Sequence, residues 1–67
     1  MTVLATLERT VKAGLSVWEF CDEDGMYYAR NNRGKRVPCS DVEDLRIFYK
    51  KMLGYGFVVP SDISSAA

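Results

Sequence analysis

The chain has 67 residues, of which 48% are hydrophobic and 12% aromatic, and its nine basic and nine acidic residues cancel to a formal net charge of zero. A chain of this length forms at most one domain, and folding buries only roughly 60% of the unfolded surface, so the core is small. The hydrophobic fraction excludes intrinsic disorder. The zero net charge gives no long-range attraction to nucleic acid or an anionic membrane, so any such binding needs a local cluster of charge.

The N-terminal segment, residues 3–13, has the pattern of an amphipathic helix. Its apolar residues fall on one side at helical spacing and its charged residues on the other. Thr2 can cap the start, and Gly14 followed by Leu15 fits the glycine ending of a Schellman motif. We therefore expect a first helix that ends at Gly14.

Residues 16–39 switch to strand-forming aromatic and β-branched residues, interrupted by the glycine turns DEDG (22–25) and NNRG (31–34). This pattern predicts a three-stranded antiparallel meander. In the second hairpin, a two-residue turn at Arg33 and Gly34 and a bulged turn fit about equally well.

The first hairpin has two possible registers. A bulged turn with left-handed Gly25 pairs Phe20 with Tyr28, and it gathers the large side chains Trp18, Phe20, Met26 and Tyr28 on one face. A two-residue turn at Asp24 and Gly25 pairs Tyr28 with Cys21 instead and divides these side chains between the faces. We expect the first register, because one face must be buried.

The segment SDVE, Ser40 to Glu43, matches the capping box that opens a helix. The helix that follows carries an apolar stripe and ends at Gly54, and residues 57–59 add a short strand or extended packing segment. The expected fold is α+β: a helix, a three-stranded antiparallel meander and a second helix (αβββα), with both helices on one sheet face. The domain spans residues 1–59, and residues 60–67 form a flexible tail.

Catalytic, metal and cofactor sites are not expected. The chain contains no histidine, no phosphate-binding glycine loop and no calcium-loop spacing. The acids near Glu19 lie in or beside a turn, where carboxylates keep ordinary pKa values. Cys21 and Cys39 lack CxxC spacing, which favours two free thiols in a reducing compartment. No apolar run is long enough for a membrane span or a signal peptide, and we expect a cytoplasmic protein.

The stretch YYARNNRGKRVPC, Tyr27 to Cys39, concentrates cations on one hairpin: Arg30, Arg33, Lys35 and Arg36. Three interpretations remain open. The cations keep an edge strand soluble, or they form a charged rim for a protein partner, or they contact phosphates while Tyr27 stacks on a base. Four phosphate contacts would give weak, salt-sensitive binding to nucleic acid.

The sheet face opposite the helices is expected to carry several apolar side chains and one acid: Val17, Cys21, Tyr27, Ala29 and Glu19. An uncovered apolar face marks an interface more often than a scattered residue does. We therefore expect a non-catalytic protein-binding module, regulatory or inhibitory in the manner of phage or mobile-element accessory proteins. A homodimer subunit and a weak nucleic-acid-binding protein are the alternatives. The expected partner-binding residues are Glu19, Tyr27, Ala29, Arg30, Arg33, Lys35, Arg36 and Ile47.

Overall fold

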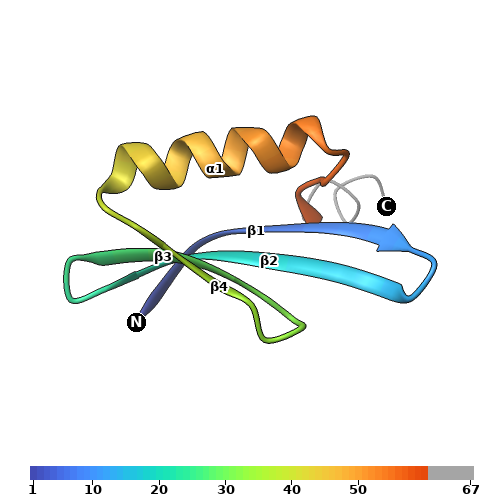
Figure 1. Ribbon diagram of the computed structural model, residues 1–67, viewed down its shortest axis with the longest axis horizontal. Coiled ribbons are helices and arrows are strands. Elements are labelled where there is room, and N and C mark those ends of the chain that lie inside the picture. Colours follow the sequence, from blue (N-terminus) through green and yellow to red (C-terminus); the bar gives the residue numbers. More distant parts are fainter. Residues whose placement is uncertain (61–67) are drawn as a thin grey trace.

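A computed structural model describes residues 1–60 and shows a four-stranded antiparallel sheet with one helix packed on one of its faces (Figure 1). The elements are β1 (Thr2–Val11), β2 (Gly14–Glu23), β3 (Met26–Asn31), β4 (Arg36–Cys39) and α1 (Val42–Gly54). The strands lie in the order β1-β2-β3-β4, as a meander. The general α+β class is confirmed, but the predicted αβββα order is wrong, because the described chain is ββββα.

The N-terminal segment forms the strand β1 and not a helix. Five of its ten residues are β-branched, and these side chains pack better on a pleated sheet than in a helix: Thr2, Val3, Thr6, Thr10 and Val11. Leu7 and Val11 are four residues apart, a spacing that fits one face of a helix and also one face of a strand. Gly14, with φ of 119°, begins β2 after a two-residue turn instead of ending a helix.

The turn between β2 and β3 is the tighter of the two alternatives. Asp24 and Gly25 both have positive φ, 53° and 79°, as the two central residues of a type I′ turn require. Tyr28 therefore pairs with Cys21, and Phe20 pairs with Ala29. The predicted pairing of Phe20 with Tyr28 is wrong. The Asp-Gly turn matches the twist of the two strands, and in a hairpin the turn geometry determines the register.

The turn between β3 and β4 is the bulged alternative. Asn31 donates its backbone N–H to the carbonyl of Lys35 at 2.9 Å, and Gly34 has φ of 89°, where a glycine avoids the steric cost of a side chain. Arg30 pairs with Arg36, and Tyr28 pairs with Pro38.

The helix α1 begins one residue later than the capping box predicted. Asp41 is the N-cap, and its Oδ1 accepts the backbone N–H of Asp44 at 2.9 Å. The Asp44 carboxylate in turn accepts from the backbone N–H and the hydroxyl of Ser40. The Asp41 side chain thus satisfies an amide of the first turn, as the first residue of a capping box does, while the Asp44 carboxylate binds the residue before the N-cap instead of the N-cap amide.

The end of α1 is a Schellman motif at Gly56 and not at Gly54. Gly56, with φ of 96°, donates to the Leu53 carbonyl at 3.1 Å, and Phe57 donates to the Met52 carbonyl at 3.2 Å. Val58 then exchanges two 2.9 Å backbone hydrogen bonds with Glu8, on the edge of β1 that does not face β2. The predicted extended segment at 57–59 is thus confirmed; the predicted tail lies outside the described residues, apart from Pro60.

The core lies between α1 and the face of the sheet beneath it. Leu7 and Ala29 have no exposed surface, and Phe20 is 1% exposed. The rings of Phe20 and Tyr49 meet edge to face, with centroids 5.3 Å apart. Because the helix occupies one face only, the side chains that point the other way have no described element above them (Figure 1).

Candidate interaction site on the open sheet face

The open face is the side of the sheet that points away from α1. Strand alternation and the pairing register place these side chains on it: Val3, Thr6 and Glu8 from β1; Val17, Glu19, Cys21 and Glu23 from β2; Tyr28 and Arg30 from β3; Arg36 and Pro38 from β4. Its acids come from β1 and β2, and its cations from β3 and β4. The face is therefore divided into an acidic half and a basic half.

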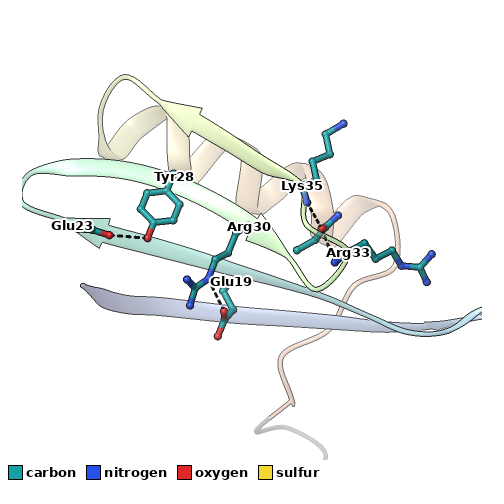
Figure 2. Close-up of polar contacts among 7 residues, drawn as sticks. Glu19, Glu23, Tyr28, Arg30, Arg33 and Lys35 are labelled. Atoms are coloured by element: carbon teal, nitrogen blue, oxygen red, sulfur yellow. Dashed lines mark hydrogen bonds and ion pairs between the residues drawn. The ribbon is translucent and has the colours of Figure 1, made fainter.

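An ion pair joins the two halves near the middle of the sheet. The Arg30 Nε donates to the Glu19 Oε1 at 2.9 Å (Figure 2), and these residues are cross-strand neighbours. The hydrogen bond to Glu19 raises the pKa of Arg30 above its ordinary value. The two side chains keep 39% and 36% of their surface exposed, so the pair remains in contact with solvent.

Tyr28 is buried on this face although no helix covers it. Its hydroxyl donates to the Glu23 Oε1 at 3.1 Å (Figure 2). The Arg36 guanidinium lies over its ring, 3.8 Å from the centroid. This stacking leaves Tyr28 4% exposed and the neighbouring Cys21 with no exposed surface. Burial, followed by the hydrogen bond to Glu23, raises the pKa of Tyr28 above its usual 10.0.

The raised pKa of Tyr28 predicts a loss of stability in alkali. The folded state favours the neutral phenol more than the unfolded state does, so the stability is complete below the unfolded pKa near 10.0 and falls as the pH rises through the folded value. We expect Tyr28→Phe to show a smaller fall in unfolding free energy between pH 9 and 11, measured by urea titration. Tyr55→Phe, at a 55% exposed tyrosine, is the control. If the unfolding free energy fell by the same amount in the wild type and in Tyr28→Phe over this pH range, the prediction would be contradicted.

The cationic turn between β3 and β4 is held in place by two asparagines. The Asn31 Oδ1 accepts the backbone N–H groups of both Arg33 and Lys35 at 2.9 Å (Figure 2). The Asn32 side chain accepts from the backbone N–H of Val17 at 3.1 Å and donates to the Leu15 carbonyl at 2.8 Å. The backbone under Arg33 and Lys35 is therefore fixed to β2, while their side chains are exposed and make no ion pair within residues 1–60.

The structure separates the residues predicted to bind a partner. Glu19, Arg30 and Arg36 lie together on the open face, and Arg33 and Lys35 extend from its rim. The predicted position of Tyr27 and Ala29 on this face is wrong: both lie under α1, where Ala29 is completely buried and Tyr27 packs against the core. The register explains the error, because a shift of one residue moves a whole strand to the other face.

Ile47 also does not belong to the open face. It is 57% exposed and lies on α1, which is in the other layer. Tyr28, which was predicted on the face under the helices, lies on the open face instead, where it contacts Arg36 and Glu23. The signal for it was the dipeptide Asp24-Gly25, the strongest short-range sign of a two-residue hairpin, which brings Tyr28 opposite Cys21.

The thiols show no arrangement for chemistry. Cys21 and Cys39 are both free, and they lie on opposite faces of the sheet. Burial, with the nearby charges of Asp44 and Asp41, raises the pKa of Cys39, which lowers its thiolate fraction. Within residues 1–60, no three acidic or cysteine side chains are grouped to hold a metal ion. The helix in this part of the chain is too short to cross a bilayer.

Comparisons of the chain with protein-family models, with curated proteins and with solved structures found no match.

Proposed function

We propose that this chain is a small, non-catalytic protein-binding module that acts through its open face and the adjoining cationic turn. The observation that carries the proposal is the turn itself. Arg33 and Lys35 are exposed and unpaired within the described chain, on a backbone that Asn31 and Asn32 hold fixed. Because the backbone under these cations is already fixed, binding has to order only their side chains, which favours recognition of an acidic protein surface.

The rest of the open face supports this role. The Arg36–Tyr28 stack and the Arg30–Glu19 pair lie on the strands that flank the turn. This face can place cations against an acidic patch of a partner. A regulatory or inhibitory module of this size, such as a phage or mobile-element protein that blocks a host enzyme, needs only a surface of this kind. Two free thiols fit a cytoplasmic site of action.

The alternative partner is nucleic acid, which the same cations favour. Tyr27 cannot stack on a base from the open face, because it lies on the other side of the sheet. The acidic half, with Glu8, Glu19 and Glu23, would also repel phosphates. A protein partner fits the face better than a phosphate backbone does, because a protein surface can place acids against the turn and other groups against the acidic half.

The charge reversal Arg33→Glu with Lys35→Glu tests this proposal. Tagged wild-type protein is incubated with lysate, and retained proteins are identified by mass spectrometry; we expect a partner that the double variant loses. The control Lys12→Glu with Lys51→Glu changes the net charge equally at two exposed positions away from the turn. Retention of the same proteins by both double variants would rule out the turn as the binding site. Salt-sensitive binding of labelled oligonucleotides, lost in the turn variant alone, would favour nucleic acid instead.

A further inference from the structure

One long side of α1 carries a seam with the spacing of a coiled coil. Val42, Arg46, Tyr49 and Leu53 follow one another at intervals of four, three and four residues, which is the a/d pattern of helices that pair along their length. We call these four residues the flank seam. The seam lies beside the stripe that packs on the sheet, where Leu45 and Met52 are buried.

Three of the four seam residues are exposed to solvent, and Tyr49 is half-buried with its ring packed against Phe20. Val42 is 46% exposed and Leu53 41% exposed, and Arg46 has no hydrogen bond or ion pair within the described residues. Two large apolar side chains, Val42 and Leu53, are thus exposed on one side of the helix, next to the half-buried Tyr49, and a grouped set of apolar side chains indicates an interface more strongly than scattered ones do.

An apolar groove adjoins the seam, between α1 and the start of β1. It has a volume of about 270 Å³ and is lined by Leu4, Ala5, Phe20, Val42, Leu45, Arg46 and Tyr49. A bulge between Val3 and Ala5 lets Leu4 line the groove next to Ala5, although successive strand residues normally point to opposite faces. Leu4 is itself 50% exposed. Seam and groove together form one uncovered apolar strip along this side of the molecule.

We propose that a second copy of this chain docks on the strip, with the two α1 helices antiparallel about a twofold axis. In this arrangement Val42 lies opposite Leu53 of the second copy, and Arg46 lies opposite Tyr49 of the second copy. The guanidinium can then stack on the tyrosine ring, which gives a partner to a cation that has none among residues 1–60 of its own chain. Each contact occurs twice, as a twofold interface requires.

Charge complementarity selects the antiparallel arrangement. Glu43 and Lys50 are seven residues apart and lie next to the seam, in the position that forms ion pairs between helices. Antiparallel helices bring Glu43 of each chain to Lys50 of the other, whereas in-register parallel helices place these residues of the two chains on opposite sides of the seam, where they form no ion pair. The antiparallel arrangement also sets the acidic first turn, with Glu43 and Asp44, near the basic last turn, with Lys51.

The dimer does not depend on the proposed function. The flank seam is on the helix layer and the open face is on the other side of the sheet, so the dimer leaves both cationic turns free. The two proposals can therefore fail separately: loss of the partner in the turn variant concerns the open face, and the oligomeric state concerns the seam.

The test measures the mass of the full chain by sedimentation equilibrium over a range of concentrations. We expect a species of twice the 7.6 kDa of one chain. Lys50→Glu places a carboxylate opposite Glu43 of the other chain in both symmetric contacts. We expect this substitution to raise the dissociation constant of the dimer about tenfold. Adding Glu43→Lys reverses both charges of each pair and should restore dimerisation, because the ion pairs are then rebuilt in the opposite sense.

Several results would overturn the proposal. A monomer at every concentration, or a dimer that Lys50→Glu leaves unchanged, would show that the seam does not pair. Circular dichroism establishes whether each variant is folded. A folded Glu43→Lys/Lys50→Glu variant that stays monomeric would also overturn it. If that variant does not fold, the two single variants are mixed instead, because only their heterodimer has two opposite-charge pairs; no association on mixing would reject the antiparallel interface.

Discussion

Phe20→Ala is expected to lower the unfolding free energy by about 3–5 kcal/mol, as truncation of a buried aromatic side chain does. Phe20 is 1% exposed and lies between the sheet and α1, where its ring meets both Phe48 and Tyr49. A domain of this length has a total stability of only about 3–10 kcal/mol. The substitution therefore removes about 30% of it or more, and with a total stability of about 5 kcal/mol or less much of the protein should be unfolded.

Urea and thermal denaturation, followed by circular dichroism, measure this loss. Phe20→Leu retains more of the buried volume and should be less destabilised, so it provides a measurable value if the alanine variant does not fold. Tyr55→Ala is the control, since it truncates an aromatic side chain that is 55% exposed. A loss below about 1 kcal/mol for Phe20→Ala would contradict its central place in the core.

The C-terminal half of the fold was predictable because its local signals agree with one another. The helix over residues 42–54 has caps, charges at both ends and an apolar stripe, and each of these indicates the same element. Only the two ends of the helix differ from the prediction. The cap shifted from Ser40 to Asp41 because either side chain can accept the first free amide, and the C-terminal glycine shifted from Gly54 to Gly56 because each is followed by an aromatic residue.

The N-terminal half was mispredicted because its signals are ambiguous over a short length. Leu7 and Val11 satisfy a helical stripe and a strand face at once, and the choice between them is made by pairing with β2, which is a long-range contact. The β-branched content of residues 2–11 was the local sign of a strand. Sheet order and the cover provided by α1 follow from that contact and could not be derived from periodicity alone.

The residues of the open face were predicted wrongly because the register of the first hairpin was predicted wrongly. Placing all large side chains of β2 and β3 on one face appeared favourable, but it assumed that an aromatic residue must be buried under a helix. Tyr28 shows another solution: Arg36 covers its ring and Glu23 accepts its hydroxyl, so it is buried on the open face. The cations themselves were placed correctly at a turn and its flanking strands, because Gly34 marks that turn in either register.

Ala29→Glu is expected to prevent folding, and it distinguishes the two registers directly. Ala29 has no exposed surface, and it lies between Phe20 on β2 and Val37 on β4, beneath α1. A carboxylate there has no cation to pair with among the core residues, and burying an unpaired charge costs several kcal/mol, comparable to the whole stability of the domain. Circular dichroism should show the loss of the cooperative thermal transition.

The control for Ala29→Glu is Thr10→Glu, which adds the same charge at an exposed position of β1. It should fold with nearly wild-type stability, because exposed substitutions usually change the unfolding free energy by less than about 0.5 kcal/mol. In the bulged register of the first hairpin, Ala29 would point away from the helix and glutamate would be tolerated there. A folded Ala29→Glu variant would therefore place Ala29 on the open face, move Tyr28 under α1, and separate Tyr28 from the Arg36 and Glu23 contacts that organise the proposed binding surface.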